Sequence, residues 1–558
     1  MRSFLAILLA ALTPSVLNSA AIAAAPVVID AAPFVDRGRA DCGLQRPIDL
    51  ASSVGGGIVL VPAGTYELRC GLLLKDGVAL TGAGIDRTVL MPARRPQRLE
   101  VVEDRLADGR IVLERLPARL EVGTAVVACE QFPPSSRNDP APCIVKSVDR
   151  EMRAITLEAP YGRPQLKPGT GCLIYGDSAA LQASVVKGDW HVVLRSTRLF
   201  RPGDELTFGA PTNESLLAHA FVHAVDGNRL ILRYPARSDF PLWPKEAALE
   251  GARVNALVWN VFPMIHGAHV RKAAIRDLTV RGHGLLPVCS TQNRWTVAGI
   301  HFFDAEELRI QRVAVRDWPS DGISLQTGDK CRVLSCEITG VLGSGLHPGT
   351  GLTNSVFSRN LVERCGAGLY FCWNNSGHVL RYNRFTHNKG GGITGLGNPL
   401  DQHNTVRNNY VAYNGTFGIE INGGGDAGNI IRDNIVENNS QAAPGKYPGI
   451  GIDSLGDGAR QYTISGNTVR DTQRQPTQHV GIEEHAGGDG NTITGNRLSG
   501  HSTADVIPSG AKTVVQNPVP AVPRKKATAK KHGASRAPLP SGPSREGSVR
   551  GTAKKRSR

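Results

Sequence analysis

Phe357-Ser358-Arg359-Asn360 and Leu380-Arg381-Tyr382-Asn383 are two copies of one phrase, in which a large apolar residue stands three positions before an asparagine. Later copies end at four further asparagines, and two earlier units carry Val313 and Cys336 in the same place (Asn409, Asn434, Asn467, Asn496). Neighbouring copies are 23 to 33 residues apart, and their β-branched alternation indicates strands. A unit this small cannot bury its own apolar side chains, so we expect the units to stack as rungs.

A glycine followed by isoleucine or leucine recurs in step with the asparagine phrase. The pairs are Gly299-Ile300, Gly322-Ile323, Gly345-Leu346, Gly368-Leu369, Gly392-Ile393, Gly418-Ile419, Gly449-Ile450 and Gly481-Ile482. Asparagine suits the tight turn of each rung, because it tolerates left-handed backbone angles and bonds locally. Stacked asparagine side chains can also bond to one another, so we expect asparagine ladders from rung to rung.

The N-terminal part carries the phrases that point to a known family. Residues 47–54 predict a short capping helix, which Gly55-Gly56-Gly57-Ile58-Val59-Leu60-Val61-Pro62 and Thr81-Gly82-Ala83-Gly84 follow. These phrases resemble the opening of the pectate-lyase-like superfamily (pectin lyase fold), and the later rungs resemble its general repeats. The resemblance covers residues 34–95 and 265–510. It implies an all-β fold, a right-handed parallel β-helix (solenoid), and the handedness comes from the resemblance alone.

The chain divides into five predicted parts. Residues 1–23 predict a signal peptide, 34–95 the N-terminal cap and first rungs, 96–260 a β-rich insertion, 261–510 the main β-helix, and 511–558 a disordered tail. The insertion contains two similar sets of strand-like phrases, which predict two small β modules. These modules could grip a substrate or merely cover one end of the helix.

Composition agrees with this division. The chain has 63 glycines and 35 prolines and only 5% aromatic residues, which argues against a membrane bundle or a coiled coil. The net charge is +15, but residues 524–558 hold twelve Lys or Arg against the single acid Glu546. The folded part is therefore close to neutral. The tail could contact an anionic envelope or another polyanion, or it could be a solvated segment with no dedicated partner.

The first 23 residues have a basic start, a short apolar run from Phe4 to Leu12 and a small-residue end at Ala21-Ile22-Ala23. This pattern predicts export to a bacterial periplasm or secretion, with no transmembrane segment. Ten cysteines suit an oxidising compartment, and Cys42–Cys70 and Cys129–Cys143 are the pairs we consider for disulfides. We expect a monomer.

The Gly-Ile register predicts which side chains face outward, because alternate residues of a strand point to opposite sides. One outward position per rung gives His301, Ser324, His347, Tyr370, Thr394, Glu420, Gly451 and Glu483. Two residues further along, the outward set includes Gln326, Cys372, Asn422 and Asp453. Longer loops before Gly449 and Gly481 would wall this face. A groove with these side chains suits a sugar polymer, and Arg294, Trp295 and Trp373 are also placed among the substrate-binding residues.

A lyase or C5-epimerase of an acidic polysaccharide removes the proton beside a uronate carboxylate and neutralises that carboxylate. We assign His347 as base, Tyr370 as acid, and His301 or Arg294 to the carboxylate. The pattern departs from the relatives that the resemblance suggests. Neither outward column holds the arginine base of pectate lyases, the Asp pair of polygalacturonases is missing after Asp321-Gly322-Ile323, and His347-Pro348 only loosely resembles the Asp-Pro-His-Asp of mannuronan epimerases.

Two alternatives stay open. One is a glycan-binding or cell-surface protein without catalysis, which would use the same groove. The other is a glycoside hydrolase with paired carboxylates, either Glu420 with Asp453 or Asp453 with Glu483. Clusters of such carboxylates are also common on ordinary soluble surfaces. No cofactor or metal is predicted, and the sequence gives no support for a calcium site.

Overall fold

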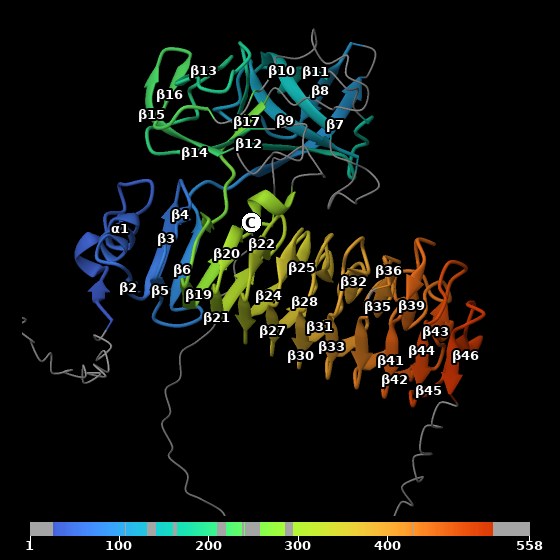
Figure 1. The fold of residues 1–558 in the computed structure, drawn as a ribbon. Helices are drawn as coiled ribbons and strands as arrows, with labels where there is room; N and C mark the ends of the chain where they lie inside the picture. The colour runs from blue at the N-terminus through green and yellow to red at the C-terminus, as the bar shows by residue number, and fades with distance from the viewer. Residues whose placement is uncertain are drawn as a thin grey trace, which may run out of the picture. The chain divides into compact units, whose positions relative to one another are not determined.

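The computed structural model describes residues 26–105, 108–130, 141–159, 164–208, 219–236, 239, 257–284, 294–426 and 428–516. The predicted signal peptide lies outside the described residues, and so does the chain beyond Gln516. Strands dominate the described part, and most of them pair in parallel with the strand of the next rung (Figure 1). The predicted all-β parallel helix is confirmed.

Each rung contributes strands to three parallel ladders. The first comprises β1 (Val28–Asp30), β2 (Gly57–Leu60), β5 (Val78–Thr81), β19 (Ala274–Arg281), β21 (Arg309–Arg316), β23 (Arg332–Leu334), β27 (Val356–Ser358), β30 (Val379–Arg381), β33 (Thr405–Arg407), β37 (Ile430–Arg432), β41 (Thr463–Ser465), β44 (Thr492–Thr494) and β47 (Val514–Gln516). The second comprises β3 (Gly64–Leu68), β6 (Thr88–Pro92), the later halves of β19 and β21, β24 (Glu337–Thr339), β28 (Leu361–Glu363), β31 (Arg384–Thr386), β34 (Tyr410–Ala412), β38 (Ile435–Glu437), β42 (Thr468–Arg470) and β45 (Arg497–Ser499).

The third ladder contains the Gly-Ile strands and is the one that positions the candidate site. It runs through β4 (Leu72–Leu73), β18 (Ile265–Ala268), β20 (Ile300–Glu306), β22 (Ile323–Asp329), β25 (Ser344–Pro348), β29 (Ala367–Tyr370), β32 (Ile393–Leu396), β35 (Ile419–Ile421), β39 (Ile450–Ile452), β43 (Val480–Glu484) and β46 (Ala504–Ile507). The isoleucine or leucine of each pair is fully buried in the core between the ladders, as the register predicts. Short strands β26 (Leu352–Thr353), β36 (Gly425–Asp426) and β40 (Ala459–Arg460) lie in the loops.

The asparagine that ends each phrase forms the predicted ladder at one corner of the rungs. The side-chain amide of Asn383 donates to Asn409 Oδ1 at 3.0 Å, and the backbone N–H of Asn383 donates to the same oxygen at 3.0 Å. The same side-chain bond joins the six members in order (Asn360, Asn383, Asn409, Asn434, Asn467, Asn496). A second ladder occupies another corner (Asn388, Asn414, Asn439, Gln478). Each turn therefore satisfies its buried backbone groups through the next rung.

Helix α1 (Gln45–Ser53) caps the N-terminal end, where residues 47–54 predict it, and buries Pro47, Ile48 and Ala51. The opposite end differs from expectation. Strand β47 pairs with β44, although it lies within the segment 511–558 that the sequence predicts as disordered. Its alternating valines continue the first ladder by one rung, because the edge of β44 offers unpaired backbone groups.

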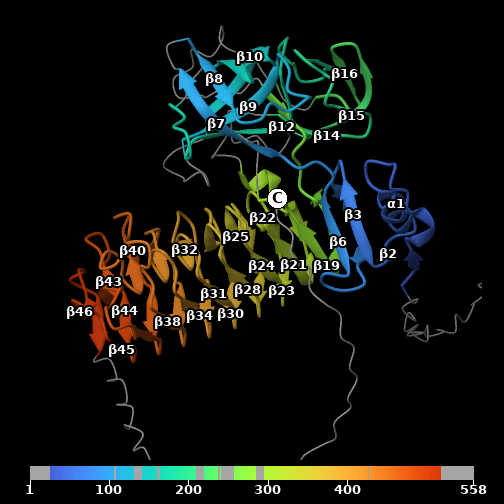
Figure 2. The same ribbon diagram turned by 180° about the vertical axis from the view of Figure 1, so that it is seen from behind.

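Between β6 and β18 the chain forms a separate antiparallel sheet. Its strands are β7 (Gln97–Arg105), β8 (Arg110–Leu113), β9 (Thr124–Cys129), β10 (Ala141–Asp149), β11 (Ala154–Glu158), β12 (Cys172–Ala180), β13 (His191–Val193), β14 (Glu205–Phe208), β15 (His219–Asp226), β16 (Arg229–Leu232) and β17 (Leu257–Trp259). Within its described residues the insertion has three apolar cores, one around Leu99, Ile111 and Leu173, another around Leu194, Leu206 and Leu230, and a third around Val127, Ile174 and Trp259. Figure 2 shows the same strands from behind.

After the insertion the chain re-enters the same helix. Strand β18 pairs with β4, and β19 pairs with both β5 and β6. The first rungs are thus built from segments that are far apart in the sequence.

The cysteines do not form the pairs that we considered. Cys42 and Cys70 remain thiols, and the Cys42 thiol donates to the carbonyl oxygen of Glu67 at 3.2 Å. In the insertion, the cross-strand neighbour of Cys129 is Cys172, whereas Cys143 lies opposite Val126. The strand register therefore separates Cys129 from Cys143, which proximity along the chain could not show.

Candidate functional site

The outward column of the third ladder is aligned as the sequence predicts. Ser324 of β22 pairs with His301 of β20 on one side and with His347 of β25 on the other. Further along, Tyr370 pairs with Thr394. One member was missed, since His266 of β18 pairs with His301 and begins the column. Strand spacing of about 4.8 Å places the strands of His301 and His347 about 10 Å apart.

His347 is held by Asp321, which ends the loop before β22. His347 Nδ1 lies 2.7 Å from Asp321 Oδ2, and both residues are at least nine-tenths buried. The other carboxylate oxygen of Asp321 accepts the backbone N–H of Ser344 at 2.7 Å. Asp321 therefore fixes both the orientation and the Nδ1 proton of the imidazole, which leaves Nε2 as the atom available for chemistry.

Two further side chains contact this imidazole. The ring of Tyr370 meets it edge to face, with the ring centroids 5.3 Å apart. The Cys372 thiol interacts with His347 and lies 3.1 Å from Thr350 Oγ1. Asp321, His347 and Cys372 thus form a carboxylate, imidazole and thiol series across three neighbouring rungs.

The charges of this series shift the pKa values in opposite directions. Burial alone lowers the pKa of His347, but interactions with Asp321 and Cys372 outweigh it and raise the pKa to about 9. Burial raises the pKa of the Cys372 thiol, yet the adjacent His347 more than offsets it, so the thiol pKa falls below its ordinary value. At neutral pH His347 is therefore an imidazolium.

A second cluster of polar side chains lies at the first rungs of the column. Glu205 of β14 is fully buried, accepts the backbone N–H of Gly71 at 2.8 Å, and lies 3.1 Å from His219 Nδ1 and 3.5 Å from His266 Nε2. Despite burial, the two histidines hold the pKa of Glu205 at about 2. The insertion thus supplies two of the charged groups beside the column.

His301 lies between these two clusters. Burial lowers the pKa of His301 well below its ordinary 6.5, and the charges of nearby histidines act in the same direction (His219, His266, His347). His301 is therefore a neutral imidazole at neutral pH. His301 has its predicted place in the outward column, but its exposed fraction is only 7%.

Residues 298–469 match the family described as the right handed beta helix region. This match agrees with the three parallel ladders. The chain is a right-handed parallel β-helix protein. No curated protein matches its sequence.

Several solved structures are similar to this β-helix protein. Two are the A-modules of mannuronan C-5 epimerases of Azotobacter vinelandii, which are 13% and 15% identical, with TM-scores of 0.45 and 0.46. These alignments cover 89% and 88% of this chain and 100% of each module. A third is the DFA-IIIase of Arthrobacter chlorophenolicus, which is 14% identical over 45% of this chain and 65% of that enzyme, with a TM-score of 0.34.

Five of the predicted substrate-binding residues of the β-helix protein fall into three groups. Gln326 and Asn422 are buried and bonded to neighbours, Gln326 to Ser324 Oγ at 3.0 Å and Asn422 to Asn398 Oδ1 at 2.9 Å. Trp373 is 52% exposed. Arg294 and Trp295 lie in the short helix η3 (Arg294–Val297), and their side chains lie outside what the structure describes.

The carboxylates of the last rungs are each held by neighbouring groups. Asp453 is fully buried, and its Oδ1 accepts the backbone N–H of Gly458 at 2.9 Å. Glu420 accepts the hydroxyl of Ser454 at 3.2 Å, and burial raises its pKa. The sequence places Asp453 on the outer surface, but its left-handed backbone (φ 60°) turns the side chain toward its own loop. Glu420 and Asp453 thus both accept structural hydrogen bonds, and the hydrolytic pairing of Asp453 with Glu420 or Glu483 stays a prediction.

Within the described ranges, no group of three or more His, Cys, Asp or Glu side chains could hold a metal ion. In the same ranges, no helix combines the length and apolar character needed to cross a bilayer.

Sequence reasoning missed four members of the site, namely Asp321, Glu205, His219 and His266. Asp321 was noted in its Asp-Gly-Ile phrase but not linked to His347, because the two meet across the corner that joins a loop to the next strand. Glu205 and His219 come from the insertion, where no repeat fixes a register. The phrase Ile265-His266 repeats Ile300-His301 and is the one signal that could have found the start of the column.

Proposed function

We propose that this protein is an exported carbohydrate-active enzyme, a lyase or C5-epimerase of an acidic polysaccharide, and that the residues around His347 are its catalytic centre. The observation that carries the proposal is the Asp321–His347 pair, 2.7 Å apart, beside Tyr370 and Cys372. A protonated imidazole held in a fixed orientation suits the recognition of a uronate carboxylate. Neutralising that carboxylate acidifies the neighbouring C5 proton, which is the first requirement of both reactions.

The pKa shifts favour His301 as the base and His347 as the partner of the carboxylate, the reverse of the assignment made from the sequence. With a pKa of about 9, His347 is a poor base at neutral pH and a good partner for the carboxylate. The neutral His301, two rungs away, is the better base for the C5 proton. Burial raises the pKa of Tyr370, so its hydroxyl keeps its proton and serves as the acid.

The two reactions share the first step and differ in the second. The base removes the C5 proton, and the electron pair is delocalised into the neutralised carboxylate. In a lyase the C4–O4 bond then breaks, Tyr370 protonates the departing oxygen, and an unsaturated uronate remains. In an epimerase a proton returns to C5 from the opposite face, and the chain stays intact.

The test is a screen of alginate, polygalacturonate and glycosaminoglycans with three measurements. Ultraviolet absorbance reports unsaturated uronate, NMR in heavy water reports deuterium at C5 without chain shortening, and affinity electrophoresis reports binding alone. We expect one of the first two signals in the wild type and its loss in His347→Ala. The matched control is His191→Ala, which removes an exposed histidine of β13.

Binding of a polymer without either chemical signal would replace the enzyme with the glycan-binding alternative. Turnover that survives in His347→Ala would remove His347 from the catalytic centre.

The basic segment 524–558 belongs to this proposal as a tether. Its surplus of eleven positive charges, twelve basic residues against Glu546, suits retention on an anionic polymer or envelope.

A further inference from the structure

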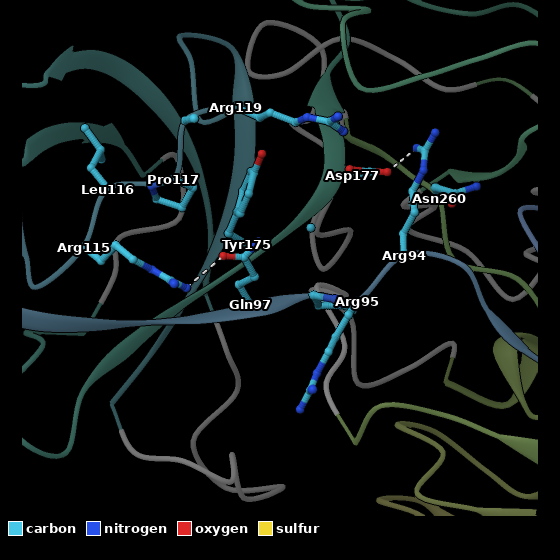
Figure 3. A pocket seen from close by; sticks show the side chains of 13 residues that line it. Arg94, Arg95, Gln97, Arg115, Leu116, Pro117, Arg119, Tyr175, Asp177 and Asn260 are labelled. Carbon is cyan, nitrogen blue, oxygen red and sulfur yellow. Dashed lines mark hydrogen bonds and ion pairs between the residues drawn. The ribbon is translucent and has the colours of Figure 1, made fainter. Parts of the chain in front are cut away.

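A hollow of about 490 Å³ lies in the insertion, on the face of the sheet that carries Tyr175. We call it the arginine hollow. Its lining residues are Arg94, Arg95, Pro96, Gln97, Arg115, Leu116, Pro117, Ala118, Arg119, Tyr175, Gly176, Asp177 and Asn260. Figure 3 shows arginines on several sides of Tyr175. The volume lies within the range of about 300–1,000 Å³ that is typical of small-molecule sites.

Three segments bring the arginines together. Arg94 and Arg95 lie in the link from β6 to β7, and Arg115 and Arg119 lie in the loop between β8 and β9. Tyr175 of β12 pairs directly with Gln97 of β7, so the link and the strand hold a fixed register. The hollow is therefore lined by one link and one loop that lie against the paired strands β7 and β12.

Only one of the four arginines is neutralised by carboxylates. Arg94 forms ion pairs with Asp177 and, at 3.1 Å, with Asp204, and it also donates to the carbonyl oxygen of Leu199 at 2.6 Å. Arg94 thus has a structural role, and Asp177, the only acidic residue of the lining, is already paired with it.

The other three arginines form no ion pair within the described ranges, although the charge of Arg119 acts on the Asp177 carboxylate and favours its ionised form. Arg115 donates to the neutral amide oxygen of Gln97 at 3.2 Å. Over the ranges that the structure describes, Arg95 and Arg119 make neither a hydrogen bond nor an ion pair. Gathering like charges around one space is unfavourable by itself, and an anion placed there would remove the repulsion. Guanidinium groups bind carboxylates with two parallel hydrogen bonds, which suits them better than lysine for this purpose.

The remaining lining suits a sugar ring. Tyr175 has an exposed fraction of only 5%, so its ring is held rigidly in the wall, and Leu116 and Pro117 add apolar surface beside it. Asn260 and Gln97 provide amide groups for hydroxyls. An apolar wall of Leu116 and Pro117 next to amides and arginines matches the two sides of a uronate, one apolar and one anionic.

We propose that the arginine hollow binds a carboxylate-bearing sugar unit of an acidic oligosaccharide, as a binding site separate from the His347 centre. The proposal rests on the proposed function for its substrate class. It gives the insertion a role in holding the polymer, whereas the chemistry stays on the β-helix.

The test uses the double variant Arg115→Gln/Arg119→Gln. Its matched control is Arg229→Gln/Arg233→Gln, which removes two exposed arginines at β16, beside the apolar core around Leu194, Leu206 and Leu230. Calorimetry measures binding of a galacturonate trimer, a neutral glucose trimer of the same linkage class and inorganic phosphate. We expect the first variant to weaken binding of the acidic trimer at least about tenfold, because two charge-assisted contacts are lost. The control variant should bind it as the wild type does, and higher salt should weaken binding in both.

Unchanged binding of the acidic trimer in Arg115→Gln/Arg119→Gln overturns the proposal, and so does equal binding of the neutral trimer. Weakened binding of phosphate alone overturns the assignment to a sugar. Thermal melts of both variants show whether the fold is retained. If no polymer is turned over while the double variant still loses the trimer, the arginine hollow stands and the catalytic proposal fails.

Discussion

His347 is the side chain in which the fold and the proposed chemistry meet most directly. It lies on β25, between Ser324 of the preceding rung and Tyr370 of the next. Its character comes from Asp321, one rung earlier, which keeps a buried imidazole protonated. The carboxylate of Asp321 therefore keeps the buried imidazole of His347 positively charged.

Asp321→Asn should lower the pKa of His347 from about 9, because Asp321 makes the largest of the interactions that raise it and only Cys372 then opposes the effect of burial. The pKa of the folded wild type lies above that of the unfolded chain. The stabilisation from this group is therefore full below pH 6.5 and is lost as the pH rises through about 9, and its size is on the order of 3 kcal/mol. Thermal melts from pH 6 to 9.5 should show this loss in the wild type and not in Asp321→Asn.

Asp329→Asn is the control for that series, because Asp329 lies on the same ladder but bonds to Lys330, Thr353 and Asn354. It should keep the alkaline loss of stability. NMR titration of the imidazole would contradict the prediction if the midpoint in Asp321→Asn equalled that of the wild type.

Cys372 should be the most reactive thiol among the described cysteines of the β-helix rungs. Its pKa is lowered beside His347, whereas burial raises the pKa values of Cys331, Cys336 and Cys365 to about 12. Thiolate is the form that reacts, so iodoacetamide at pH 7.5 should label Cys372 first, as peptide mass spectrometry can show. His347→Ala should slow the labelling several-fold. Equal rates in the two proteins, or earlier labelling of Cys331, would count against the interaction.

Among the elements, the first asparagine ladder (Asn360 to Asn496) fixes the spacing of neighbouring rungs. Asn409 accepts two hydrogen bonds from Asn383, donates to the carbonyl oxygen of Leu380 at 3.0 Å, and its backbone bonds to Asn434. Removal of this one side chain leaves buried donors of the preceding rung without partners. Such a loss costs more than the hydrogen bonds themselves contribute.

Asn409→Ala should lower the free energy of unfolding by about 2–4 kcal/mol, since a buried backbone N–H and a buried amide lose their acceptor. Urea denaturation measures the change. Asn408→Gly is the matched control in the same turn, because Asn408 has a left-handed backbone (φ 53°) that glycine adopts without strain. A loss in Asn409→Ala no larger than that in Asn408→Gly would mean that water replaces the missing acceptor.

The elements also show where sequence reasoning stops. The alternation of the Gly-Ile strands was enough to place Ser324 between His301 and His347, because a two-residue period and a repeat fix the register together. It could not show that His301 is buried. That burial depends on packing of other segments over the column, and His219 comes from a part of the chain that has no repeat. Asp453 was misplaced because one left-handed residue reverses the alternation.

In the whole molecule, charge and fold are distributed over different parts of the chain. Residues up to 523 carry a net charge of about +4, and 524–558 carry the remaining +11. Net charge governs long-range attraction but does not determine the fold. The rungs and the tail can therefore be separated by experiment.

A chain ending at Gln516 should keep the thermal midpoint of the full chain and lose most of its retention on an anionic polymer. The expected reason is that truncation removes the basic segment and leaves every described strand intact. Cation exchange and affinity electrophoresis at several salt concentrations measure the retention, and turnover of a short substrate should not change. Equal retention of both chains would assign the attraction to the arginine hollow or to the rungs.

The return of the chain to its own first rungs has a consequence for the order in which the protein folds. The backbone of Arg271 bonds to the side chain of Asp76, 195 positions away, and β19 completes a ladder begun by β5 and β6. Rungs from β21 onward need only contacts between successive repeats, whereas the pairing of β5 and β6 with β19 joins segments on either side of the insertion. This pairing closes the longest loop of the solenoid, and we expect it to be the slow step that hydrogen exchange during refolding detects.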